Sequence, residues 1–244
     1  MAELLLELLS EEIPARMQGK AANDFKRLIA DGLKEAGLTY SRLDAYFGPR
    51  RLSLVVDGIP TSQPDVTDER KGPGVAAPDK AIEGFLKANG LSSVDGAEIR
   101  ELPKGKFYFA VVERKGRATS DVLKGVIEAA LSALPWPKSM RWASGETRWV
   151  RPLHGILCVF DGAVVTVTYA DVPATDTTVG HRFLAPGPIQ ASGFDEYLEK
   201  LTAAKVMVNQ EHRRTLIADG IEKLARSESL TLPDDPGLLD EVTG

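Results

Sequence analysis

Arginine, tryptophan and histidine gather between residues 138 and 183 of this chain. The stretch reads Lys-Ser-Met-Arg-Trp at 138–142, Arg-Trp-Val-Arg-Pro-Leu-His at 148–154 and Gly-His-Arg-Phe at 180–183. Guanidinium groups bind phosphate through two parallel hydrogen bonds, and both they and aromatic rings stack on nucleobases. The candidates for contact with a nucleic acid are Arg141, Trp142, Arg148, Arg151, His154, His181 and Arg182. The competing interpretation is structural: tryptophans in the core, and arginines and histidines on a solvated face or in a polar network.

Four more cations lie outside that stretch. Arg50 and Arg51 belong to a Gly-Pro-Arg-Arg turn between two predicted strands, where we expect both guanidiniums to be exposed. Arg70 and Lys71 lie in a stretch, 60–78, whose Pro, Gly, Asp and Ser content predicts a surface loop. All four are candidate phosphate contacts, which would position a nucleic acid without reading its sequence.

The sequence predicts no catalytic residues and no metal site. His154, His181, His212 and Cys158 do not have the spacing of a compact zinc motif. No glycine-rich phosphate loop follows a strand, since Lys-Gly-Pro-Gly at 71–74 lacks the glycine spacing. Acidic Glu7, Glu11 and Glu12 precede a predicted helix, and we expect them to cap it.

Composition indicates an ordinary globular protein. The 244 residues are 43% hydrophobic and 27% charged, and the net charge of −5 argues against a surface that binds nucleic acid everywhere. The single cysteine, Cys158, lies in an apolar run and is expected to be a buried free thiol. With no signal-peptide pattern and no membrane-length apolar run, we expect a cytoplasmic location and no membrane contact.

Hydrophobic periodicity predicts alternating strands and helices. We expect strands at 4–9, 42–47, 52–59, 98–102, 106–113, 155–160 and 164–169, and helices at 15–36, 79–88, 119–134, 194–204 and 210–226. The last two strands should form a hairpin closed by Asp161-Gly162, and 233–237 should break the helical pattern. This pattern favours an α+β fold: antiparallel or mixed sheets of hairpins with packed helices, followed by a helical segment. Residues 1–186 would form the body, and the two helices of 187–244 would project from it.

Several motifs in order carry a family resemblance. They are Leu-Leu-Glu-Leu-Leu-Ser-Glu-Glu-Ile-Pro at 5–14, Pro-Arg-Arg-Leu at 49–52, Lys-Gly-Pro at 71–73, Met-Arg-Trp at 140–142, Val-Arg-Pro-Leu-His at 150–154 and Gly-His-Arg-Phe at 180–183. In order and spacing they resemble the beta subunit of bacterial heterotetrameric glycyl-tRNA synthetase over essentially the whole chain. The chain would then be an N-terminal part of a longer subunit.

The resemblance implies a division of labour. In that family the alpha subunit forms glycyl-adenylate from glycine and ATP with Mg, and the beta subunit supplies tRNA binding. This chain would therefore act as part of a glycine–tRNA ligase, be inactive alone, and have the alpha subunit and tRNA(Gly) as partners, with no DNA. Two alternatives remain: an assembly module for the alpha subunit that contacts no RNA, and a vestigial editing-type pocket for a small molecule near His154 and His181.

Overall fold

The computed structural model describes residues 2–142 and 145–244, which form two compact units. The first unit comprises the chain up to Thr61 together with Ala118–Gly244, and the second comprises Ser62–Arg117. The division expected between residues 186 and 187 lies inside the first unit.

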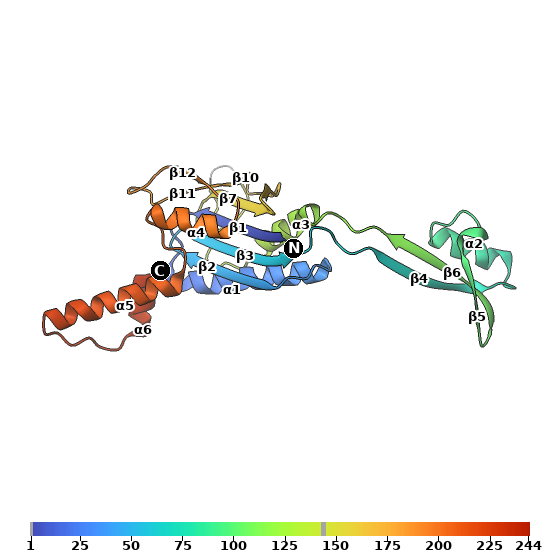
Figure 1. Cartoon of the computed structure of the whole chain (residues 1–244), viewed down its shortest axis with the longest axis horizontal. Helices are drawn as coiled ribbons and strands as arrows, with labels where there is room; N and C mark the ends of the chain where they lie inside the picture. Colours follow the sequence, from blue (N-terminus) through green and yellow to red (C-terminus); the bar gives the residue numbers. More distant parts are fainter. Residues whose placement is uncertain (1, 143–144) are drawn as a thin grey trace. The chain divides into compact units, whose positions relative to one another are not determined.

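A seven-stranded sheet forms the centre of the first unit (Figure 1). Its strands are β1 (Ala2–Ser10), β2 (Arg42–Gly48), β3 (Arg51–Ile59), β7 (Leu153–Phe160), β8 (Ala163–Val164), β9 (Thr168–Tyr169) and β10 (Val172–Thr175). They run in the order β2-β3-β1-β7-β10-β9, with β8 paired to β7, and only the β10–β7 pairing is parallel. The apolar run of β1 is therefore central, with β3 and β7 on either side.

Helices cover both faces of this sheet, which is why β1 is apolar without alternation. Leu4, Leu6 and Leu8 pack on the face covered by α1 (Ala15–Glu35) and α3 (Thr119–Ala133). Leu5 packs on the opposite face with α4 (Phe194–Ala203). Glu7 points to that second face as well, because successive side chains of a strand alternate. A carboxylate is thus placed where an apolar residue would be expected.

The expectation that both C-terminal helices project from the body is wrong for α4. Its residues Phe194, Tyr197 and Leu201 are buried against the sheet. After α4 come α5 (Gln210–Ser227) and α6 (Pro236–Thr243), which pack on each other, and α6 also contacts α1. A short two-stranded sheet of β11 (Thr177–Val179) and β12 (Pro188–Gln190) precedes α4.

The second unit is a three-stranded antiparallel sheet with one α-helix, followed by a short 3-10 turn. Its elements are β4 (Val66–Gly74), α2 (Asp79–Ala88), η1 (Val94–Gly96), β5 (Glu98–Leu102) and β6 (Gly105–Arg114), with strand order β4-β6-β5. At its base, the Gln63 N–H donates to the Arg117 carbonyl at 2.9 Å. Only glycine fits at Gly116, where a Cβ would lie 1.8 Å from the Gln63 carbonyl oxygen. In the first unit, the Thr119 N–H donates to the Thr61 carbonyl at 2.9 Å.

The α+β class is confirmed, and three local predictions are corrected. The loop expected at 60–78 contains β4, which pairs with β6 although its own sequence does not alternate. The hairpin expected at 155–169 is limited to β7 and β8, because β9 pairs with β10 instead. The break expected at 233–237 starts a helix: Asp235 accepts a hydrogen bond from the Leu238 N–H, and Pro236 occupies the first turn.

Candidate nucleic-acid interface

A buried carboxylate anchors the end of the sheet where the candidate site lies. Glu7 is 1% exposed and accepts hydrogen bonds from Arg51 Nε at 3.0 Å, Tyr197 Oη and Thr178 Oγ1. The Tyr197 hydroxyl also lies 2.7 Å from Ser53 Oγ. Burial, and then the negative charge of Glu7, raise the pKa of Tyr197, so this hydroxyl keeps its proton and donates it. The buried Glu7 carboxylate is therefore paired with one cation and accepts hydrogen bonds from two hydroxyl groups.

This cluster corrects the expectation for Arg51. Both arginines of the Pro-Arg-Arg turn were expected to be exposed, but Arg51 is 8% exposed and its second contact is the Val179 carbonyl. The Arg50 side chain is 19% exposed, and its Nε donates to the Ser10 carbonyl at 3.1 Å. The capping expectation for the acidic residues is also wrong for Glu7, which lies in mid-strand, and Pro14 caps α1 without any side-chain hydrogen bond. Arg51 therefore holds β3 to β1 and β11.

A second carboxylate, Glu11, organises a polar cluster at the surface. Its Oε1 lies 2.7 Å from His154 Nε2, and its Oε2 accepts from Arg182 Nη2 at 2.8 Å. Arg182 also reaches Glu12 Oε1 at 3.0 Å, and Arg50 Nη2 lies 3.8 Å from Glu11 Oε1. The hydrogen bonds from Arg182 and then His154 lower the pKa of Glu11 to about 2. Three candidates far apart in sequence are thus brought together around one carboxylate.

A pocket of about 440 Å³ opens beside this cluster, within the first unit. It is lined by Glu12, Pro49, Arg50, Arg51, Gly180, His181, Arg182, Phe183, Lys205, Val206, Met207 and Arg213. Cations outnumber the single lining carboxylate. Burial and the nearby positive charge of Arg182 lower the pKa of Arg50, which shows that positive charges crowd one another here. We call this feature the cationic pocket.

Two cations of the cationic pocket keep their charge uncompensated. Arg213 donates to the carbonyls of Thr243 at 2.7 Å, Met207 at 2.9 Å and Phe47 at 3.1 Å, all of which are neutral acceptors. Lys205 is exposed and has no carboxylate within 4 Å in the part of the chain that the structure describes. An anionic ligand would therefore meet available positive charge in this pocket.

An exposed aromatic ring stands at the rim of the cationic pocket. Phe183 is 80% exposed and follows directly on Arg182. The turn that presents it is held by His181, whose Nδ1 accepts the backbone N–H groups of Phe183 and Leu184 at 3.2 Å each. His181 therefore has a structural task, and the ring it positions combines with the adjacent guanidinium in the way that suits a stacked nucleobase.

The remaining candidates of the 138–183 stretch do not join this pocket. Trp142 packs against the main core, and Arg148 donates to the side chain and carbonyl of Ser139 at 3.0 and 3.1 Å. Arg151 is partly buried and donates to the Val150 carbonyl at 2.8 Å. Arg141 is exposed. The structural interpretation fits Trp142, whereas the arginines lie outside the cationic pocket.

Arg70 and Lys71 belong to the second unit, on β4. Arg70 Nε pairs with Asp68 at 3.0 Å, and Lys71 Nζ lies 4.0 Å from the centroid of the Phe107 ring. They are described separately from the cationic pocket because they lie in a different compact unit.

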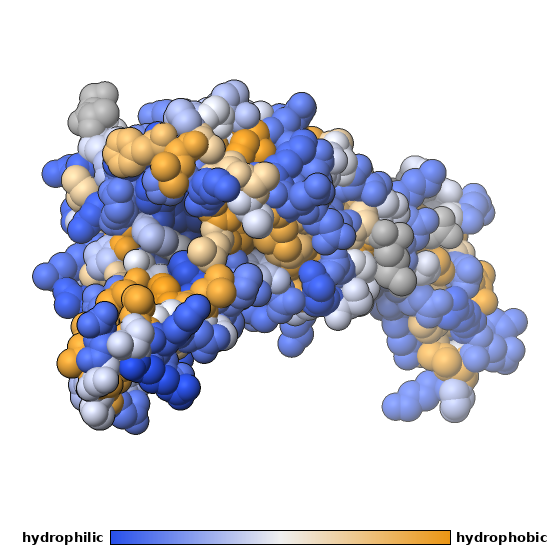
Figure 2. All heavy atoms as spheres, turned by 60° about the vertical axis from the view of Figure 1, so that its left-hand side comes forward, coloured by the Kyte–Doolittle hydropathy of each residue, from blue (hydrophilic) through white to orange (hydrophobic). Residues whose placement is uncertain are grey.

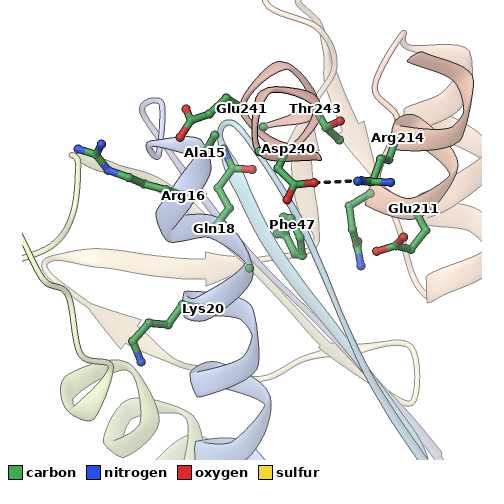
Figure 3. Close-up of a pocket in the computed structure, with 14 residues that line it drawn as sticks. Ala15, Arg16, Gln18, Lys20, Phe47, Glu211, Arg214, Asp240, Glu241 and Thr243 are labelled. Carbon is green, nitrogen blue, oxygen red and sulfur yellow. Dashed lines mark hydrogen bonds and ion pairs between the residues drawn. The ribbon is translucent and has the colours of Figure 1, made fainter. Parts of the chain in front are cut away.

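A second cavity, of about 510 Å³, lies between the start of α1 and the helices α5 and α6 (Figure 3). Its charges are mixed: Arg214 Nε pairs with Asp240 at 3.0 Å, and Arg16, Lys20, Glu211 and Glu241 also line it. The exposed ends of α5 and α6 and the segment that joins them carry apolar patches (Figure 2), with Leu224, Leu230 and Leu238 each at least 60% exposed. This end of the unit is thus less cationic and more apolar than the cationic pocket.

Residues 2–142 and 145–244 contain no group of three or more His, Cys, Asp and Glu placed to hold a metal ion. Over the same residues, no helix is long and apolar enough to cross a membrane. Cys158 is a buried free thiol, and burial raises its pKa to about 12. The buried thiol of Cys158 is therefore not arranged as a nucleophile.

Sequence reasoning missed Lys205, Arg213 and Phe183 as members of the site. Phe183 ends the Gly-His-Arg-Phe motif and could have been found there as an aromatic ring beside an arginine. Lys205 and Arg213 follow α4, and only the packing of α4 on the sheet brings them to the Pro-Arg-Arg turn.

Comparisons with known proteins agree with the motifs. The profile of the family described as glycyl-tRNA synthetase beta subunit matches residues 4–244. Proteins named glycine–tRNA ligase beta subunit are 47% identical in Rhodospirillum centenum over 268 aligned residues, 48% in Dinoroseobacter shibae over 248, and 46% in Paracoccus denitrificans over 248. These matches cover all of this chain and 38%, 34% and 36% of the relatives, so the chain spans little more than a third of their length. The chain therefore belongs to the glycyl-tRNA synthetase beta subunit family.

Proposed function

We propose that this chain supplies a tRNA contact to the ligation of glycine to tRNA(Gly), with ATP used at a partner alpha subunit. The observation that carries the proposal is the cationic pocket with its exposed ring. Phosphate groups need cations that are not already neutralised, and Lys205 and Arg213 provide them. Phe183 beside Arg182 offers the stacking surface that an unpaired base uses.

Geometry favours a single-stranded or splayed part of the tRNA over a helical part. The pocket is concave and its aromatic ring is presented on a tight turn, whereas double-stranded RNA is recognised by shape along its shallow groove. An unpaired nucleotide could place its base on Phe183 and its phosphate toward Lys205. Arg50 and Arg182, held by Glu11, would line the path of the backbone.

The test uses the complex of alpha and beta subunits with tRNA(Gly). Lys205→Ala should weaken tRNA binding several-fold and lower the slope of log affinity against log salt by nearly one unit, because one phosphate contact is lost. Phe183→Ala should weaken binding about tenfold with an unchanged salt slope, since stacking involves no counterion release.

Lys223→Ala is the matched control, because Lys223 is an exposed lysine of α5 that does not line the cationic pocket. It should bind tRNA like the unchanged complex. If Lys205→Ala and Phe183→Ala also bind normally, the cationic pocket is not a tRNA contact.

A second function, subunit assembly, is favoured by the apolar ends of α5 and α6. Leu224 and Leu238 are 68% and 60% exposed and belong to a group of exposed apolar residues on α5, α6 and the segment between them, which also includes Ile221, Leu232 and Val242. An exposed apolar patch of this kind is typical of a surface that contacts another protein. Leu224→Glu should then weaken capture of the alpha subunit and leave tRNA affinity per assembled complex unchanged. Unchanged capture would leave RNA contact as the sole proposed contribution of this chain.

A further inference from the structure

One face of the sheet in the second unit carries two aromatic rings that no helix of that unit covers. Helix α2 packs on the opposite face, where a Cβ on Gly72 would lie 2.7 Å from the Phe85 ring and where Tyr108 and Ala110 are buried. Because side chains alternate along β6, Phe107 and Phe109 point away from α2, and both are only half-buried. The rings are two residues apart on one strand, about 7 Å along it.

Each ring of this face has a cation over it. Lys71 Nζ lies 4.0 Å from the Phe107 centroid, and the Arg100 guanidinium carbon lies 5.0 Å from the Phe109 centroid. The two cations come from the two flanking strands, β4 and β5. The rings therefore face away from α2, each with a cation over its outer face, and a ligand reaches a ring only where its cation moves aside.

The two cations differ in how firmly they are held. Arg100 pairs with Glu69 at 2.8 Å and Glu98 at 2.7 Å, so its guanidinium is fixed over Phe109. Lys71 has no carboxylate within 4 Å among the described residues and is held only by the ring. A cation–π contact at an exposed site is worth only about 0.5–1 kcal/mol, so Lys71 can move aside at little cost.

We propose that this face binds an unpaired nucleotide of an RNA, with the base stacked on Phe107 and Lys71 moved to its phosphate. An aromatic ring on a sheet with a mobile cation beside it is the combination that single-stranded nucleic acids use, because every base has a face that stacks and every nucleotide has a phosphate. Phe109, covered by the fixed Arg100, provides a guanidinium plane as the neighbouring stacking surface. Glu69 and Glu98 neutralise Arg100, so the phosphate contact falls to Lys71.

This inference rests on the proposed tRNA contact for its choice of RNA, but it uses different residues in a different compact unit. The probe is a short fluorescein-labelled RNA without secondary structure, titrated with the full 244-residue chain and followed by anisotropy. Phe107→Ala should weaken binding about tenfold, and Phe107→Tyr should bind like the unchanged chain. Lys71→Ala should weaken it several-fold and flatten its salt dependence.

A direct readout comes from Phe107→Trp. The natural tryptophans, Trp136, Trp142 and Trp149, all lie outside residues 62–117, so the new indole reports on this face. Its emission should be quenched when the RNA is added to Phe107→Trp. In the double variant Phe107→Trp/Lys71→Ala at high salt, adding the RNA should leave the emission unchanged. Lys80→Ala, an exposed lysine on α2, is the matched control and should bind normally.

The outcomes separate this proposal from the cationic pocket. If Lys205→Ala weakens RNA binding while Phe107→Ala does not, or if the new tryptophan is not quenched, the inference fails and the pocket stands. If Phe107→Ala weakens binding while Lys205→Ala and Phe183→Ala do not, the pocket fails instead. Loss of alpha-subunit capture by Phe107→Ala with unchanged RNA affinity would assign this face to a protein partner and overturn the inference, as would the absence of any RNA binding.

Discussion

Two carboxylates of the same segment, Glu7 and Glu11, meet adjacent arginines of the same turn in opposite surroundings. Glu7 and Arg51 are 1% and 8% exposed and share their hydrogen bonds with a tyrosine and a threonine. The Glu11 side chain is 34% exposed, and its contact with Arg50 is long, at 3.8 Å. Similar residue types thus belong to the scaffold in one place and to the rim of the proposed binding site in the other.

The difference follows from the cost of removing a charge from water. A buried ion pair whose partner is deleted leaves an uncompensated charge, which costs about 3–5 kcal/mol. An exposed pair is replaced by water at a cost of about 0–1 kcal/mol. Glu11 can therefore exchange its long contact with Arg50 for water at little cost. Arg50 itself stays held by the Ser10 carbonyl, to which its Nε donates at 3.1 Å, and Arg51 cannot leave Glu7.

The largest expected effect is that of Arg51→Ala. It should lower the free energy of unfolding by about 3–5 kcal/mol, because Glu7 would remain buried without its cation. Urea unfolding of the chain measures this, with Arg50→Ala as the comparison, which should cost less, about 1–2 kcal/mol, because it loses a long ion pair and the hydrogen bond from its Nε to the Ser10 carbonyl. Equal losses for the two variants would mean that the buried and exposed clusters do not differ in the way described.

Tyr197→Phe should have an intermediate effect. The variant keeps the ring packed on the sheet but removes one hydrogen bond to Glu7 and one contact with Ser53. Leaving buried polar groups short of a partner costs about 1–3 kcal/mol. Ser53→Ala removes only the weaker neutral contact and should cost less. If Tyr197→Phe is neutral, Glu7 does not depend on this hydroxyl.

Glu11→Gln tests the exposed cluster through pH. The folded-state pKa of Glu11 is lowered from 4.5 to about 2, so its contribution to stability is present above about pH 4.5 and lost as pH falls toward 2. The variant should remove that part of the pH dependence. Because the side chain is about one-third exposed, the amplitude should stay below about 1 kcal/mol. The measurement is the melting temperature of both proteins between about pH 6 and about pH 2. The prediction is contradicted if Glu11→Gln loses stability below about pH 4.5 as steeply as the unchanged chain.

The smallest effect is expected for Arg148→Ala. Arg148 is exposed and, among the residues that the structure describes, bonds only to Ser139, so the change should stay within about 0.5 kcal/mol. Thermal melts of Arg148→Ala and Arg51→Ala measured side by side compare an exposed arginine with a buried one. A large drop for Arg148→Ala would show that Arg148 supports the scaffold in the way that its buried neighbour Trp149 does.

Local patterns predicted most of the elements because their causes are local. The apolar stripe of α1, the Gly37 that follows it with a φ of 69°, and the Asp161-Gly162 turn all act within a few residues. The strand β4 could not be predicted in this way, since its residues do not alternate and its pairing with β6 is set by residues some forty positions later. The start of α6 was predictable from Asp235 and Pro236, whose capping pattern was interpreted as a break.

In the candidate site, too, the residue types could be predicted from the sequence, but their long-range contacts could not. Arg50, His154 and Arg182 were identified from residue type, but spacing gave no information on which carboxylate would hold them. His181 was identified in the same way, but its contacts are the backbone N–H groups of its own turn. The burial of Arg51 depends on Glu7 and Thr178, which are 44 and 127 residues away in sequence. Long-range pairing of this kind follows from strand order and from the docking of α4, neither of which is written in any local motif.

The two points where the chain crosses between the units determine how easily the second unit can be removed. The chain leaves the first unit at Thr61 and returns at Ala118, and the Thr119 N–H reaches the Thr61 carbonyl at 2.9 Å. The two cut ends of the first unit therefore already lie side by side. Residues 62–117 could be excised and the gap closed by a short glycine turn without stretching the remaining sheet. The unit can therefore be exchanged in the laboratory as a single cassette.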